Sequence, residues 1–167
     1  LMQHGERATD KPIGMMREYV ALLRECLSGE PVTFEGDYFR SKRFRLGVRL
    51  GERKPKIIMA ALNPQMLKLA GEVADGVLLN YLPASHVGTS IEQIRKGGDA
   101  EIYAYVHAAV GDFERSAKSA RKDLFNYAMA DGYARMFSQA GFADEIKELR
   151  ARQAEKDREG ALAAVSE

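Results

Sequence analysis

Two short, continuous apolar runs lie on either side of a helix-like segment in the middle of the chain. The first run occupies residues 56–62 and the second residues 77–82, and Pro, Asn-Pro or Asp-Gly turns bound them. Such runs are typical of strands buried on both faces, as in parallel sheets. Between them, residues 64–74 place apolar side chains at helical spacing, with Asn63 at the N-cap and Pro64 at the first helical position. The pattern predicts a βαβ unit with parallel strands.

The alternation of strand and helix patterns continues on both sides of this unit. Before it, an apolar stripe predicts a helix over 14–27, and alternating residues predict a short hairpin or an extended excursion over 31–40. After it, the pattern predicts a helix over 84–96, a strand over 101–110, and helices over 113–129, over 131–140 and from 143 onward. Three strands fall short of a closed (β/α)8 barrel, which needs eight strands and typically ~250 residues. The sequence is therefore compatible with two α/β folds, a small open sheet or the trailing half of a barrel.

Composition narrows the class of protein. The chain has 167 residues, of which 46% are hydrophobic and 29% charged, an ordinary globular balance that excludes wholesale disorder and fibrous repeats. The net charge of +1 argues against a chain built to hold nucleic acid or an anionic membrane. No apolar run approaches the ~20 residues that cross a bilayer, and residues 1–11 lack a signal-peptide core. With a single cysteine, Cys26, we expect a cytoplasmic protein without an internal disulfide. Because the sequence begins with Leu1, we also expect a processed chain or a piece of a longer one.

Several isolated features carry weaker signals. Residues 40–56 are rich in Lys and Arg, but Phe44 is the single aromatic there, so a solvated loop is favoured over a nucleic-acid patch. Cys26 reads as a small apolar residue of the first helix rather than a nucleophile, because no His or Asp is spaced to activate it. His107 is expected to be a packed or surface residue of the third strand. His86 follows the second strand in a loop on the side where barrel sites assemble. No group of His, Cys and carboxylates has metal-ligand spacing.

Two segments resemble one known family. Residues 58–80, IMAALNPQMLKLAGEVADGVLLN, and more loosely residues 16–38, resemble the bacterial luciferase-like monooxygenases, in the branch that uses coenzyme F420 or flavin mononucleotide (FMN). The resemblance extends from about residue 5 to about residue 145. It implies a TIM (β/α)8 barrel of which this chain supplies the carboxy-terminal part, including the last three strands. The whole chain is then one partial domain, divided into a helix with an extended excursion (1–54), βα units (55–130) and terminal helices (131–167).

The resemblance also implies a site. A strand followed directly by a helix N-terminus presents unpaired backbone N–H groups and the positive end of the helix dipole, which suit a phosphate. By resemblance, Ala61, Leu62 and Asn63 would line the phosphate end of the cofactor, and Asn80 would add a side-chain hydrogen bond. Family members usually carry Gly where this chain has Asn63, and Asn is the residue other than Gly that best tolerates left-handed φ. The alternative for these four residues is a capped helix packed on a buried sheet.

The family resemblance implies an oxidoreductase, either a monooxygenase or a dehydrogenase, that acts on a small-molecule substrate. Residues 60–64 favour F420 over FMN as the cofactor by their resemblance to that branch. Since the first half of the barrel is absent, no catalytic residue is assigned, and we expect no turnover from this chain alone. The alternative is a non-catalytic remnant or a binding subunit of the same fold, for example a homodimer that pools two half-sheets.

Overall fold

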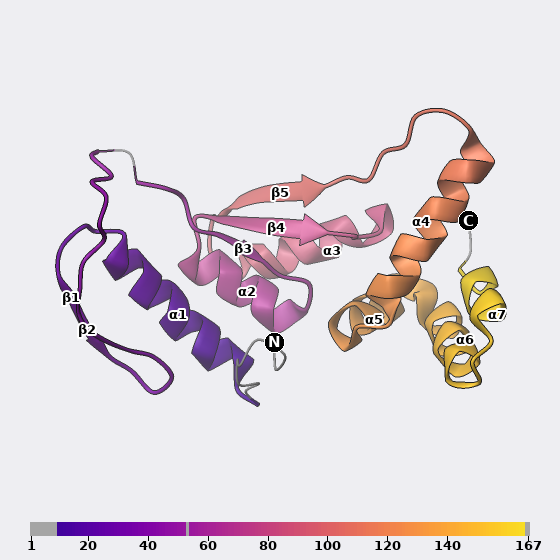
Figure 1. The fold of residues 1–167 in the computed structure, drawn as a ribbon, viewed down its shortest axis with the longest axis horizontal. Coiled ribbons are helices and arrows are strands. Elements are labelled where there is room, and N and C mark those ends of the chain that lie inside the picture. Colours follow the sequence, from indigo (N-terminus) through magenta and orange to yellow (C-terminus); the bar gives the residue numbers. More distant parts are fainter. Residues whose placement is uncertain (1–9, 53, 166–167) are drawn as a thin grey trace.

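The structure, a computed structural model, describes residues 10–52 and 54–165 and contains two packed regions (Figure 1). The first region consists of a helix, an antiparallel hairpin and a small parallel sheet with two covering helices. The second consists of helices alone, and residues 106–112, which form neither helix nor strand, join it to the last strand. The predicted single domain also includes residues outside this description, namely 1–9, Arg53 and 166–167.

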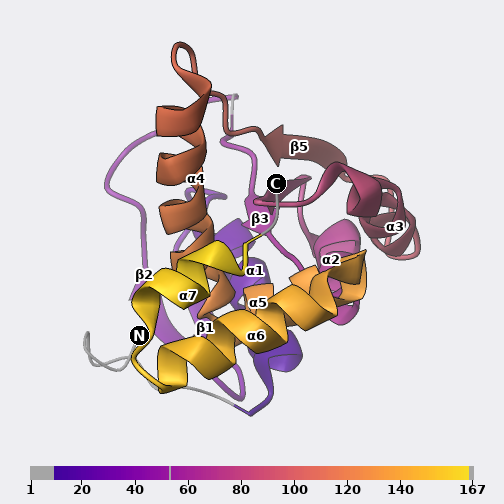
Figure 2. The same cartoon turned by 90° about the vertical axis from the view of Figure 1, so that its right-hand side faces the viewer.

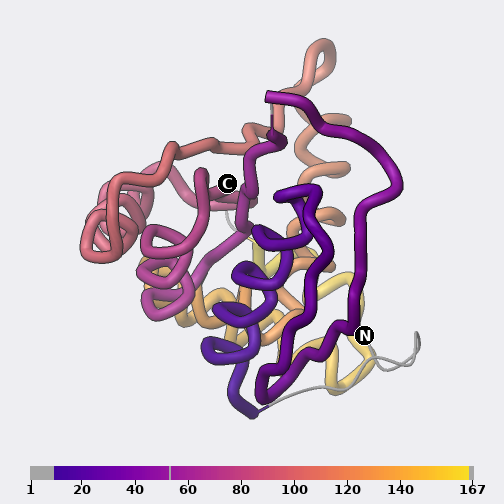
Figure 3. Tube along the Cα trace, turned by 90° about the vertical axis from the view of Figure 1, so that its left-hand side faces the viewer, coloured from indigo at the N-terminus to yellow at the C-terminus, as the bar shows by residue number. Residues whose placement is uncertain are grey.

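The first helix and the hairpin are tied together by one carboxylate. Helix α1 (Pro12–Cys26) begins two residues before its predicted start, and β1 (Val32–Glu35) pairs with β2 (Arg40–Phe44) in an antiparallel hairpin alongside it (Figure 3). Glu18 of α1 accepts hydrogen bonds from three consecutive backbone N–H groups at the hairpin turn, those of residues 37, 38 and 39, at 2.8, 2.9 and 2.6 Å. Burial alone would raise the pKa of Glu18, but these three donors outweigh it and hold the pKa below its ordinary value.

The predicted βαβ unit is present and continues into a third parallel strand. Strands β3 (Ile58–Ala60), β4 (Gly76–Asn80) and β5 (Glu101–Tyr105) form one sheet in the order β3-β4-β5, with both pairs parallel. Helices α2 (Pro64–Val73) and α3 (Ala84–Arg95) cover one face of this sheet (Figures 1 and 3). The segment boundaries agree with the prediction because strand runs, turn residues and the Pro at the helix start are all local signals.

The main core lies between the sheet and these helices, and it corrects the prediction that β3 is buried on both faces. Met59 and Val77, paired across β3 and β4, are 6% and 0% exposed and contact apolar residues of α2 and α3. Ile58, on the other face of β3, is 46% exposed. The apolar sequence of β3 therefore predicts more burial than the described residues provide.

Two glycines allow α2 and α3 to pack unusually closely. A Cβ atom on Gly71 of α2 would lie 2.2 Å from the carbonyl oxygen of Ile94 in α3. A Cβ atom on Gly97, just after α3, would lie 2.0 Å from the carbonyl oxygen of Lys68. Both neighbours are backbone atoms, which cannot move aside cheaply, so larger residues would force the helices apart. This close approach fixes the spacing between the C-terminal ends of the two helices.

The second region is a helical bundle that packs around its own core (Figure 2). Its elements are α4 (Phe113–Ala128), α5 (Asp131–Phe137), the π-helical turn η2 (Ser138–Phe142), α6 (Ala143–Ala154) and α7 (Arg158–Ala163). The α-helix predicted over 131–140 ends at Phe137 and continues as the π-helical turn η2, and Gly141, with a φ of 106°, interrupts the right-handed backbone just after the predicted end. Leu82, just after β4, packs against the cores of both regions.

Two other predicted segments differ in the structure. The strand predicted over 101–110 ends at Tyr105, because its neighbour β4 ends at Asn80, which is paired with Tyr105, and offers no partner beyond. The alternating pattern therefore continues into residues 106–110, which are exposed and not part of a strand. The solvated loop predicted over 40–56 is wrong at its start, where Arg40–Phe44 form β2, whereas the described residues of the segment after β2 form a mostly exposed stretch without helix or strand.

Candidate functional site at the carboxyl edge of the sheet

The four residues predicted to form the site all lie at or just beyond the carboxyl ends of β3 and β4. Ala61 is 4% exposed and belongs to the main core, so only its backbone is in a position to serve a ligand. Leu62 is half-buried and packs against the core of the helical region. Asn63 stands at the N-cap of α2, and Asn80 is the last residue of β4.

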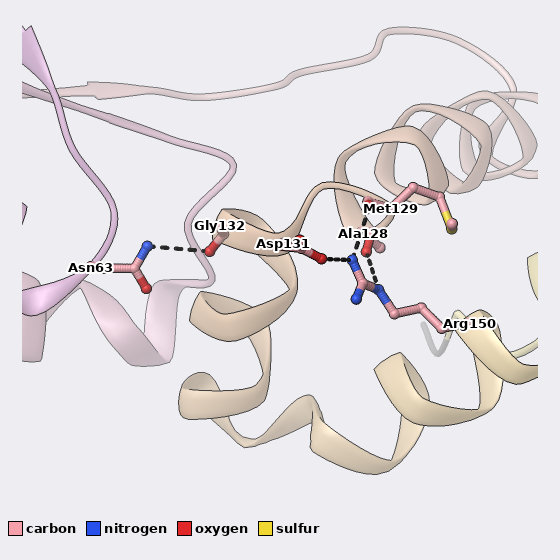
Figure 4. Close-up of polar contacts among 6 residues, drawn as sticks. All are labelled: Asn63, Ala128, Met129, Asp131, Gly132 and Arg150. Carbon is pink, nitrogen blue, oxygen red and sulfur yellow. Dashed lines mark hydrogen bonds and ion pairs between the residues drawn. The ribbon is translucent and has the colours of Figure 1, made fainter. Parts of the chain in front are cut away.

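The two asparagines are brought together by one helix, α5. The Nδ2 atom of Asn63 donates to the backbone carbonyl of Gly132 at 3.3 Å (Figure 4). The Nδ2 atom of Asn80 donates to the hydroxyl of Tyr133 at 2.8 Å. Consecutive residues of the first turn of α5 therefore contact the tips of two neighbouring strands. Sequence patterns could not predict this contact, since each bond joins residues more than fifty positions apart.

Arg150 of α6 holds this first turn of α5 in place (Figure 4). Its guanidinium donates to the carbonyls of Ala128 and Met129 at the end of α4, at 3.2 and 2.8 Å. It also pairs with the carboxylate of Asp131 at 2.7 Å, and this arginine, acting through its hydrogen bond, lowers the pKa of Asp131. Because a planar guanidinium can satisfy several acceptors at once, one side chain joins the end of α4 to the start of α5.

The N-terminus of α2 is left without a side-chain cap. Asn63 occupies the N-cap as predicted, but its φ and ψ of −102° and 152° are extended rather than left-handed. Its amide is turned to Gly132 instead of the first turn of α2, which has no side-chain cap hydrogen bond and no acidic residue. Free N–H groups in the first turn of a helix, together with the helix dipole, attract an anion.

A pocket of about 240 Å³ opens beside this helix end. Leu62 and Pro64 form one side of it, and His86 and Ser90 of α3 form another. Ser90 is 1% exposed, and its hydroxyl has no hydrogen-bond partner among the described atoms. A buried hydroxyl without a hydrogen-bond partner lowers the stability of the fold. A polar group that entered the pocket could supply that partner. No Asp or Glu is among the described residues that line it.

Ser90 was missed by the sequence analysis, and His86 was misplaced. The missed signal is that Ser90 falls within the apolar stripe of α3, between Val87 and Ile94, where a polar side chain has to be buried. His86 lies in the first turn of α3 rather than in a loop, because the helix begins directly after Pro83. The two side chains are one helical turn apart and face the same pocket.

Beyond the strand ends, aromatic rings stack around His107. The ring centroid of His107 lies 3.9 Å from that of Tyr81 and 4.8 Å from that of Tyr105. The rings continue from Tyr81 to Tyr127 at 4.1 Å and from Tyr127 to Tyr133 at 4.7 Å. Burial raises the pKa of Tyr81 above its ordinary value. The prediction that His107 is a packed or surface residue of the third strand is wrong about the strand, because His107 is an exposed residue of the connection after β5.

The part of the chain that the structure describes shows neither a metal-binding cluster nor a membrane-spanning helix. Residues 10–52 and 54–165 contain no group of three or more His, Cys, Asp or Glu side chains arranged to hold a metal ion. None of the helices in these ranges is both long and apolar enough to span a bilayer. Cys26 is half-buried at the end of α1 and forms no disulfide.

Parallel βα units occur both in (β/α)8 barrels and in open α/β sheets, and both classes bind ligands at the carboxyl ends of their strands. The structure resembles the coenzyme F420-dependent tetrahydromethanopterin reductase from Methanopyrus kandleri with a TM-score of 0.73 and 22% sequence identity. The match covers 93% of this chain and 48% of that chain. The fold is accordingly part of a (β/α)8 barrel.

The sequence comparisons identify the family within that class. The family model described as luciferase-like monooxygenase matches residues 2–167, so the chain belongs to the luciferase-like monooxygenase family, and the predicted resemblance is confirmed. A 5,10-methylenetetrahydromethanopterin reductase from Methanolobus tindarius is 30% identical over 142 residues, 75% of this chain and 43% of the relative. An F420-dependent glucose-6-phosphate dehydrogenase from Nakamurella multipartita is 30% identical over 106 residues, 56% of this chain and 31% of the relative. The chain spans less than half the length of these curated relatives.

Proposed function

We propose that this chain is the part of an F420-dependent oxidoreductase that holds the phosphate-bearing tail of the cofactor. Membership in the luciferase-like family supports an oxidoreductase, and the printed names of several relatives include F420. When bound, F420 supplies hydride transfer, and the protein contributes binding and orientation. Neither the substrate nor a catalytic residue is assigned, because the chain spans less than half of those relatives.

The single observation that carries this proposal is the combination of the uncapped N-terminus of α2 with the unpartnered hydroxyl of Ser90. Both border the 240 Å³ pocket, which Leu62 and Pro64 also line. A phosphate oxygen needs hydrogen-bond donors and a positive field, and backbone N–H groups with a helix dipole provide both. The absence of carboxylates among the described lining residues removes the repulsion that would oppose an anion.

The two asparagines fit a supporting role at this edge. Each side-chain amide donates one N–H to α5, and its second N–H can donate to a ligand, because an amide nitrogen carries two donors. Asn80 is the last residue of β4, and β4 is the neighbour of β3, after which the N-terminus of α2 begins. This is the position in which the predicted site places Asn80. Since FMN also carries a phosphate, these donors suit either cofactor, and the choice of F420 follows from the names of the relatives.

The proposal is tested by titrating the 167-residue chain with F420 and with FMN and following cofactor absorbance. We expect F420 to bind more tightly than FMN, and Ser90→Ala to weaken F420 binding by about tenfold through the loss of one donor to an anion. Ser85→Ala is the matched control, because Ser85 is exposed on the same helix and does not line the pocket. Tighter binding of FMN, or equal loss in both variants, would contradict the proposal.

A further inference from the structure

We propose that a second cavity, at the carboxyl ends of β4 and β5, binds a planar and mainly apolar small molecule. The cavity has a volume of about 520 Å³ and lies between the strand ends and the helical region. None of the four residues predicted to hold the cofactor, nor Ser90, is among the residues that line it. The inference thus goes beyond the proposed function and does not depend on F420.

The walls of this cavity come from both packed regions. Leu79 of β4 and Ala104 of β5, which are paired across the sheet, form the strand side. Phe137 of α5, Phe142 of η2 and Leu149 of α6 form the helix side. A volume of this size and a lining dominated by apolar side chains are typical of small-molecule sites, which prefer the junction between packed units. The two regions therefore enclose a ligand-sized space rather than a flat surface.

A cluster of aromatic rings in the cavity wall favours a flat ligand. Tyr81, His107 and Tyr105 all line it, and their rings contact one another through His107. Tyr81 holds a φ of 51°, a left-handed conformation that is uncommon for a tyrosine, and such conformations cluster at active sites and ligand-binding sites. Tyr105 is 59% exposed, so part of this aromatic surface is open to an incoming molecule. Ring faces favour another planar ring at stacking distance.

The few polar groups set a second limit on the ligand. Apart from the tyrosine hydroxyls, the described lining residues carry one imidazole, that of His107, and one carboxylate, that of Glu145. No Lys or Arg is among them, so nothing there neutralises a phosphate. A planar apolar frame with one or two neutral polar substituents fits, whereas a sugar phosphate would lose its hydration without compensation.

Calorimetric titration of the 167-residue chain with 2-naphthol and with glucose 6-phosphate, both without F420, tests this inference. We expect saturable binding of 2-naphthol at one site and none of glucose 6-phosphate. Ala104→Trp, which fills the cavity, should weaken 2-naphthol binding by about tenfold or more. Ala108→Trp should leave it within about twofold, because Ala108 is exposed nearby and does not line the cavity.

Methyl NMR of the unsubstituted chain provides a measurement that needs no variant to fold. With 2-naphthol, the resonances of Leu149 and Val87, which line the cavity, should shift, and that of Ile58 on the opposite face of the sheet should not. Binding without shifts at Leu149 and Val87, absence of saturable binding, or binding of glucose 6-phosphate there would overturn the inference. Because F420 is left out, these outcomes are independent of the cofactor titration.

Discussion

Asn80 at the end of β4 and Tyr133 in the first turn of α5 are joined by a hydrogen bond of 2.8 Å, although 53 positions separate them in the sequence. The bond is half-buried and lies at the edge of the sheet where the cofactor is proposed to bind. It couples the orientation of the Asn80 amide to the position of the helical region. The site and the packing of the two regions are therefore parts of one arrangement.

This coupling predicts a non-additive effect in a double-mutant cycle. Asn80→Ala and Tyr133→Phe each remove one partner of the bond, and we expect a coupling free energy of unfolding of about 1 kcal/mol. Urea denaturation of the four proteins measures it. Tyr127→Phe is the control, because the ring of Tyr127 belongs to the same stack but its hydroxyl is not bonded to Asn80. Additive effects in the Tyr133 cycle would show that the bond does not form.

Substitution of Arg150 should destabilise the contact between α5 and the edge of the sheet, although Arg150 itself lies in α6. The guanidinium of Arg150 donates to two backbone carbonyls and to Asp131 at once, and the single ammonium of Arg150→Lys cannot reproduce this geometry. We therefore expect the unfolding free energy to fall by about 2 kcal/mol. Arg152→Lys is the control, since Arg152 forms exposed ion pairs with Glu148 and Asp157, and its substitution should lower the unfolding free energy much less. Thermal unfolding compares the two, and equal losses would count against a special role for Arg150.

Ser90 should show opposite effects on stability and on binding. Ser90→Ala removes a buried hydroxyl without a partner, and we expect the free energy of unfolding to rise by about 1 kcal/mol more than in Ser85→Ala. Both substitutions replace a serine by alanine on the same helix, and they differ in that Ser90 is buried whereas Ser85 is exposed. Chemical denaturation gives the difference. Destabilisation by Ser90→Ala would mean that the hydroxyl already has a partner within the protein.

Asp75 makes the stability of the sheet depend on acid pH. Its carboxylate accepts from the backbone N–H of Ile57 at 2.8 Å and from Arg24 at 3.1 Å, and these contacts, the Ile57 bond foremost, lower its pKa. A depressed folded-state pKa stabilises the protein above the ordinary value of about 3.9, and this contribution is lost as the pH falls through the lower folded value. Asp75→Asn should therefore cost about 1 kcal/mol at pH 7, and the difference should shrink as the pH falls below about 3.9 toward the lower folded-state pKa of Asp75.

The matched control for this pH dependence is Asp99→Asn, because the side chain of Asp99 is 98% exposed. Urea denaturation at several pH values should show a pH-dependent difference from the unsubstituted chain for Asp75→Asn and almost none for Asp99→Asn. A constant difference across the acid range for Asp75→Asn would mean that its charge is not what stabilises the sheet.

The predictable part of the fold is the part encoded by local signals. The apolar runs around residues 58 and 77 and the Asn-Pro start of α2 define the βαβ unit to within a residue or two of its observed boundaries. The end of β5 was not predictable, because alternation alone does not reveal that β4 has stopped at Asn80. The exposure of Ile58 on one face of β3 was not predictable either, since burial depends on residues that are distant in the chain.

The same distinction holds for the candidate site. The phosphate-binding potential of a strand end followed by a helix start is local, so the segment from Ala61 to Asn63 could be singled out, and its role remains a prediction. The turning of the Asn63 amide toward Gly132 depends on the placement of α5, which no local pattern specifies. Ser90 was recoverable in principle from its position in an apolar stripe, but only the structure shows that its hydroxyl lacks a partner.

The most direct measurement compares the affinity of the 167-residue chain for F420 with its affinity for the deazaflavin chromophore without the phosphate tail. If the corner of α2 and Ser90 holds the tail, F420 should bind at least about tenfold more tightly than the tail-free compound. Equal affinities would contradict that placement, because the corner would then contribute nothing to cofactor binding.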